Sequence, residues 1–349
     1  MKGLEPNKFY AEVLFFPEGN GEDGADAICV SWFRTSPRGE PISRKMILID
    51  GGFADQAQQI IDYIKSKGGS TLELVVNTHP DQDHYSGLSK VFKDKAISVK
   101  AFSAHKPCGY EGLKSHFPEG PEREKMKKYG LDGMCDLFSA ISKRPGDIKS
   151  PFVKLYDDAE VRVDVLGPTE DDYVELFRNF RGVSGIDESQ EKAFSEVKPE
   201  DEFKSSSGAD KSAKNASSMV LKFTFKAANN KIAILTADAT VESLDKALKE
   251  VPTEDRERTV LFQLPHHGSI HNIREHQIRG LFAGRLQKKV HGIPPGKCYA
   301  VASISETAAK NAPENCVKKC FEKYSVDHVS TAGKLCGIRI SKEAVARYI

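Results

Sequence analysis

The chain of 349 residues contains no run of about 18 apolar residues, which is the length that a membrane-spanning helix requires. It also lacks the opening pattern of a charged segment followed by an apolar one that marks a secretory signal. Its formal net charge is only +1, so no strong charge of either sign dominates the molecule. We therefore expect a soluble protein of the cytoplasm that does not associate with membranes.

Cysteine is scarce and widely spread. The seven cysteines are an odd number, and only Cys316 and Cys320 lie close together, one helical turn apart. This distribution argues against a disulfide framework and favours a reducing compartment. Two interpretations of the pair stay open: packing on one helix face, or a zinc or redox role.

The near-zero net charge conceals a segregation of charges along the chain. Residues 90–154 carry an excess of Lys and Arg, residues 157–202 carry an excess of Asp and Glu, and the stretch 279–297 has basic residues but no acidic ones. A basic region beside a site can gather an anionic substrate. The same residues can equally form an ordinary solvated surface.

The pattern of apolar segments predicts a sandwich of two β-sheets flanked by helices. KFYAEVLFFP, ADAICVSWF and KMILIDGG are typical of a strand meander, and a helical pattern and the buried strand TLELVVNT follow. Strand, helix and strand in this order indicate α/β layer packing. The second half repeats this order of elements with SSMVLKFTFKA, KIAILTAD, TVLFQLPHHGS and KCYAVASIS. We expect a single domain over residues 1–349.

Two segments interrupt this pattern. Residues 105–150 mix Gly, Pro, Lys and short helical pieces, which indicates an insertion beside the core. Residues 183–217 are rich in Glu, Lys, Ser and Ala and poor in large apolar residues, so we predict a flexible loop there.

A dense group of potential metal ligands follows the strand TLELVVNT. The run His79-Pro-Asp81-Gln-Asp83-His84 lies between this strand and a predicted helix. In extended chain His79, Asp81 and Asp83 point to one side, and the turn into the helix can bring His84 round. The alternative is a solvated acidic turn in which Asp83 caps the helix.

Two further strand ends carry similar residues. Asp238 ends KIAILTAD before a helix, where ligation and helix capping are both open. The pair His266-His267 ends TVLFQLPHHGS. Imidazole and carboxylate ligands suit divalent Zn, Mn or Fe, and this carboxylate-rich set predicts one or two ions of Zn or Mn.

In combination, these motifs resemble the metallo-β-lactamase superfamily. The order IDGG, THPDQDH-x-x-G, a later strand ending in Asp, and LPHHGS resembles in particular the soluble hydrolase domain of ComEC-type proteins, which has HxDxDH where most of the superfamily has HxHxDH. Gly24-Ala-Asp26-Ala-Ile and Asn215-Ala-Ser-Ser218-Met-Val-Leu resemble further family motifs. The resemblance implies a four-layer αββα sandwich with insertions.

The resemblance also implies how the ligands divide between two metal sites. Asp83, His84, Asp238 and one of His266 and His267 would form one site, and Asp238 would bridge to a second site of His79 and Asp81. The second site lacks its usual third histidine, and Asn215 or Ser218 lies in that neighbourhood. Two other departures are Ala237 in place of the usual Gly and Ala312-Pro313 in place of a late His-Pro pair.

The predicted function is that of a metal-dependent hydrolase. A bound divalent ion lowers the pKa of water to about 7, so that metal-bound hydroxide is available as the nucleophile. Asp83 or Asp81 would orient that water, and the spare histidine of the pair His266 and His267, or else His271, would protonate the leaving oxygen. His267 is therefore a candidate both for catalysis and for ligation.

The ComEC-type resemblance implies an anionic phosphodiester substrate, either DNA or a nucleotide. Candidate substrate-binding residues are Asn215, Ser218, Arg279, Arg285, Lys288 and Lys289. Two alternatives stay open: a hydrolase of other esters, lactones or amides, and a degenerate domain retained for binding.

Overall fold

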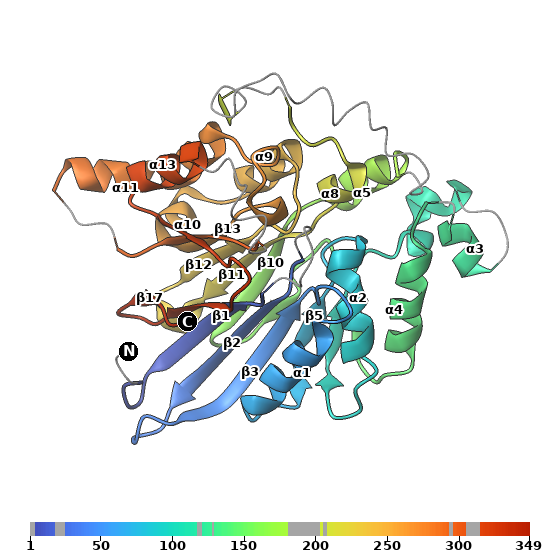
Figure 1. Ribbon diagram of the computed structural model, residues 1–349, viewed down its shortest axis with the longest axis horizontal. Helices are drawn as coiled ribbons and strands as arrows, with labels where there is room; N and C mark the ends of the chain where they lie inside the picture. The colour runs from blue at the N-terminus through green and yellow to red at the C-terminus, as the bar shows by residue number, and fades with distance from the viewer. Residues whose placement is uncertain are drawn as a thin grey trace.

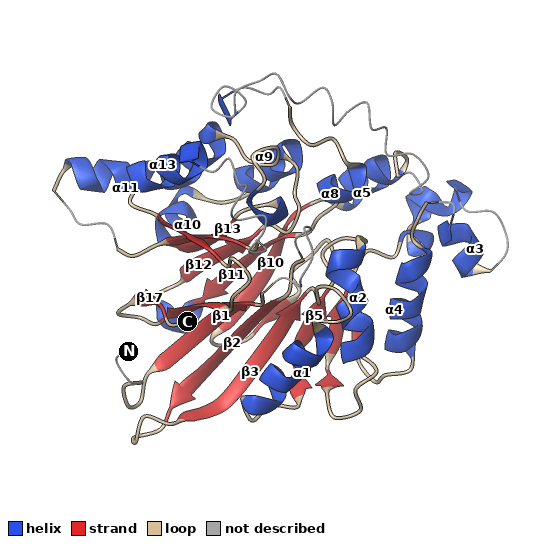
Figure 2. Cartoon of the chain, in the orientation of Figure 1, coloured by secondary structure: helices blue, strands red, loops and turns tan. Residues whose placement is uncertain are grey.

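The computed structural model describes residues 4–17, 25–116, 121–127, 129–180, 203–204, 208–292, 296–304 and 315–349. Two large β-sheets form the centre of the molecule, and helices lie on their outer sides (Figure 1, Figure 2). This arrangement confirms the predicted α/β fold class, a four-layer αββα sandwich.

The first sheet has eight strands and begins with the predicted meander. β1, β2 and β3 pair antiparallel, and β3, β5, β7 and β8 then pair parallel. In spatial order the strands are β17 (Val345–Arg347), β16 (Cys336–Ile340), β1 (Phe9–Phe15), β2 (Ile28–Thr35), β3 (Pro41–Ile49), β5 (Leu74–Val76), β7 (Ala101–Ser103) and β8 (Asp147–Lys149).

The second sheet has seven strands, and its strands β12 to β15 are parallel. In spatial order they are β15 (Asp327–Ser330), β14 (Tyr299–Ala302), β13 (Thr259–Gln263), β12 (Lys231–Leu235), β11 (Val220–Phe225), β10 (Val161–Gly167) and β9 (Tyr156–Asp157). A small additional sheet pairs β4 (Thr71–Leu72) with β6 (Ser98–Val99).

Helices connect the parallel strands, as parallel pairing requires, whereas α5 and α8 lie between the antiparallel strands β10 and β11. The helices of the first half are α1 (Ala57–Ser66), α2 (Gln82–Val91), α3 (Glu122–Lys127), α4 (Asp132–Ser142) and α5 (Glu170–Phe177). Those of the second half are α8 (Ala213–Ala216), α9 (Val241–Lys249), α10 (Thr253–Arg258), α11 (Glu275–Val290) and α13 (Asn315–Lys323). Short 3-10 turns cover Pro107–Gly109 (η1), Glu111–His116 (η2), Lys226–Ala228 (η3) and His266–Gly268 (η4).

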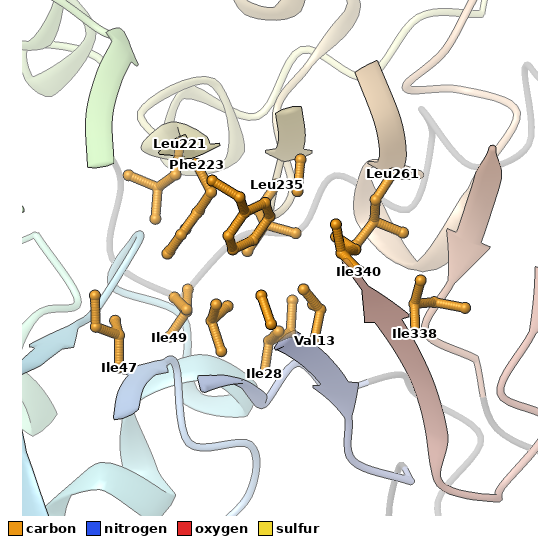
Figure 3. Packing of buried hydrophobic residues seen from close by; sticks show 14 of the residues in the cluster. Val13, Ile28, Ile47, Ile49, Leu221, Phe223, Leu235, Leu261, Ile338 and Ile340 are labelled. Carbon is orange, nitrogen blue, oxygen red and sulfur yellow. The ribbon is translucent and has the colours of Figure 1, made fainter. Parts of the chain in front are cut away.

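The central core lies between the two sheets. Figure 3 shows Val13 and Ile28 of the first sheet facing Leu221 and Phe223 of the second. Every residue of β1 is buried, because helices or other strands cover both faces of the sheet. Each fully buried side chain of this kind contributes about 1.5–3 kcal/mol through removal of apolar surface from water.

The two interrupting segments have different structures. In the predicted insertion 105–150, α4 packs against α2 beside the core (Figure 1). In the predicted flexible loop, residues 208–217 are described and form α8 and a hydrogen-bonded turn, with Asn215 and Ser217 buried. Residues 203–204 are also described, and the remainder of 183–217 lies outside the described residues.

In the described part of the chain, no helix combines the length and the apolar character that crossing a bilayer demands.

The end of β3 contacts α2 at backbone level, and this contact sets the position of the helix. The amide of Gly51 donates to His84 O at 2.8 Å, and that of Gly87 donates to Gly52 O at 2.9 Å. A Cβ atom on Gly87 would lie 1.8 Å from Gly51 O, so no larger residue fits. The close contact of Gly51 with Gly87 therefore fixes where the first turn of α2 presents its side chains.

We expect Gly87→Ala to lower the free energy of unfolding by about 1–3 kcal/mol, because the added methyl group forces β3 and α2 apart. Urea denaturation measures this change. Gly280→Ala is the matched control in helix α11, where an added Cβ meets nothing within 4 Å. The control should raise stability by up to about 1 kcal/mol through helix propensity. Equal effects of the two substitutions would contradict the contact argument.

Candidate metal centre

The candidate ligands come from three strand ends that meet at one edge of the sandwich. The run His79–His84 joins β5 to α2, Asp238 follows β12, and His266 and His267 follow β13. Gln263 ties two of these ends together, since its Oε1 accepts from the amide of Thr236 at 3.0 Å and its Nε2 donates to Asp26 Oδ2 at 2.6 Å. The sheets thus hold the ligand-bearing loops in fixed positions.

Four of the predicted ligands form one compact group. One ligand atom from each of Asp83, His84, Asp238 and His267 lies within 4.8 Å of all the others. His84 Nε2 is 3.5 Å from both Asp83 Oδ2 and Asp238 Oδ2. His267 Nε2 is 3.5 Å from Asp83 Oδ2 and 3.9 Å from Asp238 Oδ2. Of the two adjacent histidines, His267 is the one that belongs to this group.

A buried carboxylate behind the group fixes the orientation of two histidines. Asp50 Oδ2 accepts from His84 Nδ1 at 2.8 Å and from the hydroxyl of Thr78 at 2.6 Å. Because that hydroxyl proton is used, Thr78 Oγ1 accepts the proton of His79 Nδ1 at 3.1 Å. Both imidazoles therefore carry a proton on Nδ1 and direct Nε2 into the site, so Nε2 is the nitrogen that could bind a metal.

The second half of the site is less complete. His79 Nε2 lies 3.7 Å from Asp81 Oδ2 and 3.6 Å from Asp238 Oδ2. Neither His79 nor Asp81 belongs to the compact group, which is the one set of three or more His, Cys, Asp or Glu side chains that meets this distance criterion in the described part of the chain. His79 and Asp81 thus lie beside the group and do not form a group of their own.

His266 lies on the rim of the site. Its Nε2 is 3.7 Å from Asp238 Oδ2, and its side chain is 36% exposed, against 13% for His267. The side chain of Asn272 donates to Asp210 and to the carbonyls of Asp238 and Ala239, so its Oδ1 accepts from His266 Nδ1 at 3.1 Å. The ring of His266 is thereby held with Nε2 toward the site.

The imidazoles and carboxylates of the group stabilise each other's charged forms. Burial opposes ionisation of Asp238, but the charges of His84 and the other imidazoles outweigh it and hold the pKa of Asp238 well below its usual range. Burial likewise opposes protonation of His84, but Asp238, Asp83 and Asp50 outweigh it and raise the pKa of His84. Burial lowers the pKa of His79. A positive charge is thus favoured where His84 Nε2 faces the carboxylates.

Unpartnered polar atoms give an independent test of whether a metal fits. His79 Nε2, His84 Nε2 and Asp238 Oδ1 are buried and have no hydrogen-bond partner among the described residues. Such atoms normally find a partner because an unsatisfied buried polar group is costly. Two neutral imidazoles and two carboxylates are a donor set that Zn or Mn accepts. The residues therefore fit a divalent cation.

Helix capping does not explain the carboxylates. The N-cap residue of α2 is Asp81, whose side chain makes no capping hydrogen bond, and Asp83 lies in the first turn. The N-cap residue of α9 is Thr240, whose side chain accepts from the amide of Ser243. The alternative interpretation of Asp83 and Asp238 as caps is therefore wrong.

The backbone at these strand ends is strained. Ala237, His266 and His267 have φ values of 46°, 47° and 56°, in the left-handed region that favours glycine. Ala237 thus has the backbone conformation that suits the glycine expected there. Strain of this kind persists where the surrounding structure enforces it. The other sequence departure, Ala312-Pro313, lies outside the described residues, as does Gly24.

The predicted substrate-binding residues do not all lie at the site. Asn215 is buried and donates to Asp210 Oδ2 at 2.8 Å, and the Oγ of Ser218 is buried. Lys288 pairs with Glu257 at 3.5 Å and lies 13 residues after Glu275, the start of α11, which is about 20 Å along the helix axis. Lys289 follows it and is exposed near the C-terminal end of α11.

Arg285 has a structural role that sequence reasoning did not anticipate. Its guanidinium is buried and donates to three backbone carbonyls, those of Tyr324, Gly296 and Ser325. Three of its five N–H donors are therefore used inside the protein, and the prediction that it holds substrate phosphates does not fit this buried position. Arg279 is exposed on α11.

The cysteine pair also lies away from the metal group. Cys320 is buried in the cluster of apolar side chains beneath α11 and α13, and Cys316 packs against the same cluster. Burial raises the pKa of Cys320 to about 11, which keeps its thiol protonated. This environment supports the packing interpretation of the pair.

Sequence reasoning missed several residues around the site. Asp50, Asp210 and Lys214 were not among the predicted ligands, although Asp50 ends a strand just as Asp238 does, which was an available signal. Asp210 and Lys214 fall in the segment that was predicted to be a flexible loop. Asp26 Oδ1 lies 3.8 Å from His267 Nδ1, behind that ligand.

The family comparison covers the part of the chain that holds the first group of candidate ligands. Residues 43–170 match the family model of the metallo-beta-lactamase superfamily. This span contains β3, Asp50 and the run His79–His84, whereas Asp238 and His267 lie beyond it. The search of curated proteins finds no match. The finer resemblance to ComEC-type proteins stays a prediction.

Several solved structures share low similarity with the chain. The metallo-beta-lactamase fold protein YhfI from Bacillus subtilis has a TM-score of 0.42 at 11% identity, over 95% of this chain and 99% of that one. MEM-A1, a subclass B3 metallo-beta-lactamase from a soil metagenome library, has 0.35 at 13%, over 92% and 97%. A motif mutant of a metallo-beta-lactamase from Cronobacter sakazakii has 0.32 at 13%, over 89% and 90%.

We expect Asp50→Asn to weaken Zn²⁺ binding by about 10–100-fold, because His84 loses the charged acceptor of its Nδ1 proton and the Thr78 hydroxyl that orients His79 loses the same acceptor. Isothermal titration of metal-stripped protein at pH 8 measures this loss. Asp62→Asn, on the exposed face of α1, is the control and should bind Zn²⁺ as the unmodified chain does. Unchanged affinity in Asp50→Asn would show that the carboxylate does not support the ligands.

Proposed function

We propose that this protein is a metal-dependent hydrolase whose substrate is a phosphodiester. The observation that carries the proposal is the group Asp83, His84, Asp238 and His267, with its buried and unpartnered ligand atoms. When bound there, a divalent cation would make water more acidic and withdraw charge from a phosphoryl oxygen. Zn and Mn are the ions that the donor set suits.

The residues around the cation would share the remaining work. Asp83 and Asp81 have side chains that are 22% and 32% exposed, so each can accept a hydrogen bond from an attacking water. With His267 among the ligands, His266 is the spare histidine. When both of its ring nitrogens carry a proton, Nδ1 can keep donating to Asn272 while Nε2 gives its proton to the leaving oxygen. His271 stays the other candidate for this role, and its Nδ1 donates to Gly208 O at 2.9 Å.

Fewer observations favour a phosphodiester as the substrate than favour metal-dependent hydrolysis. The motif resemblance favours it, and one cation, Lys214, lies at the edge of the site, 3.6 Å from Asp81. The basic residues of α11 add little support, because Arg285 donates to backbone carbonyls and Lys288 lies near the C-terminal end of the helix. Hydrolysis of other esters, lactones or amides is the second candidate, since the same group would activate water for any of them. A degenerate domain retained for binding is the third.

Metal analysis and a substrate panel test the proposal together. Purified protein should carry Zn or Mn by elemental analysis, and it should cleave bis-p-nitrophenyl phosphate or single- or double-stranded DNA with the metal added. We expect Asp83→Ala and His84→Ala to lower the rate by at least about 100-fold, as loss of an essential group in catalysis does. Equal rates in variant and unmodified protein would refute the catalytic proposal. Less than a tenth of an ion per chain would favour the binding domain, and cleavage of p-nitrophenyl acetate or a lactone alone would favour the second candidate.

The adjacent histidines should separate ligation from proton transfer. His267→Gln should lose most bound metal, because His267 belongs to the compact group. His266→Gln should keep its metal but lower kcat by about 100-fold or more, the usual contribution of a general acid. Metal content and kcat measured on the same preparations test both expectations. Loss of metal in His266→Gln, or its retention in His267→Gln, would reverse the assignment.

A further inference from the structure

The ammonium group of Lys214 lies in the second half of the site. Its Nζ is 3.6 Å from Asp81 Oδ1 and 3.4 Å from Gly130 O, and its side chain is only 15% exposed. The other oxygen of the same carboxylate, Asp81 Oδ2, faces His79 Nε2 at 3.7 Å. One carboxylate therefore lies between the lysine and the histidine that would hold a second metal ion.

Hydrogen bonds on both sides hold the short helix α8 that carries Lys214. At its start, the Oγ of Ser212 accepts from the amide of Asn215 at 3.3 Å, and Asn215 Nδ2 donates to Asp210 at 2.8 Å. At its end, the carbonyl of Ser217 accepts from His105 Nε2 at 3.1 Å. His105 in turn stacks on Tyr173, with ring centroids 4.0 Å apart. Lys214 is thus positioned by the fold and is not a free surface side chain.

The donors available to a second ion are few. Apart from Asp238, which belongs to the compact group, the second half offers His79 and Asp81, and no further set of ligands converges there among the described residues. An ion bound to Asp81 Oδ2 would share that carboxylate with the ammonium on Oδ1. The single negative charge of Asp81 would then face the two positive charges of the ion and the one of the ammonium. At this short range the ion and the ammonium repel each other strongly.

We propose that the centre holds one divalent cation, bound by Asp83, His84, Asp238 and His267, and that the ammonium of Lys214 takes the place of a second. In that position Lys214 is a binding residue for an anionic oxygen of the substrate, such as a phosphate oxygen. An ammonium has three donors; among the described residues, Lys214 Nζ donates to Gly130 O at 3.4 Å and forms an ion pair with Asp81 Oδ1 at 3.6 Å. The part that concerns the substrate rests on the proposed function, whereas the number of ions does not.

Metal stoichiometry tests the first part without any assay of activity. Metal-stripped protein is titrated with Zn²⁺ by calorimetry, and bound metal is counted by elemental analysis after dialysis. We expect one tightly bound ion in the unmodified chain. Lys214→Met, which keeps the length of the side chain but removes its charge, should strengthen binding of a second ion at least tenfold. Lys211→Ala, three residues away and exposed, is the control and should match the unmodified chain.

Two outcomes of the titration would overturn the inference. Two ions of comparable affinity in the unmodified chain would show that Lys214 excludes nothing. An equally weak second ion in Lys214→Met would show that its charge is irrelevant there. If no ion binds at all, both this inference and the proposed function fail.

Binding of inorganic phosphate to the Zn-loaded protein tests the second part. Lys214→Met should weaken phosphate binding at least tenfold, Lys214→Arg should retain most of it, and Lys211→Ala should not change it. Unchanged thermal unfolding of Lys214→Met excludes a loss of fold as the cause. Equal phosphate affinity in Lys214→Met and the unmodified chain would overturn this role even if the protein cleaves phosphodiesters. Phosphate binding that depends on Lys214, without cleavage of any diester, would leave the inference intact and refute the proposed function.

Discussion

The buried carboxylate of Asp238 is the constraint on which the site depends. Imidazole nitrogens of His79, His84, His266 and His267 lie 3.5–3.9 Å from its Oδ2, and its side chain is only 4% exposed. A buried charge of this kind is costly unless opposite charge or hydrogen bonds compensate it. The surrounding residues are arranged so that a cation can supply that compensation.

The architecture explains how such a cluster stays in place. The first sheet supplies the ligands of the run His79–His84, and the second sheet supplies Asp238 and the two histidines after β13. Packing of the two sheets around one apolar core fixes the distance between these sets (Figure 3). At the edge of the sheets, Asp50 orients two histidines, and Gln263 joins the ends of β12 and β13 to Asp26. The residues behind the ligands are thus as much a part of the site as the ligands.

The two halves of the site differ in chemistry. One half gathers four ligands of alternating kind, imidazole and carboxylate, around a common point. The other half has one histidine, one carboxylate and the ammonium of Lys214. Lys214 belongs to the segment 183–217, and it contacts Gly130 of the insertion 105–150. The site is therefore asymmetric in charge, with a place for a metal ion beside a fixed organic cation.

The fold class and three of the four residues of the compact group can be predicted from local sequence patterns alone. Apolar periodicity predicted the sandwich, and the polar residues after TLELVVNT, KIAILTAD and TVLFQLP marked Asp83, His84 and Asp238 as ligands. Local patterns achieve this because strand ends are short-range features. Only the tertiary structure chose His267 over His266, placed Arg285 on backbone carbonyls and brought Lys214 to Asp81. These contacts join residues far apart in the chain, or depend on the φ angles of two adjacent residues, and neither spacing nor periodicity encodes such information.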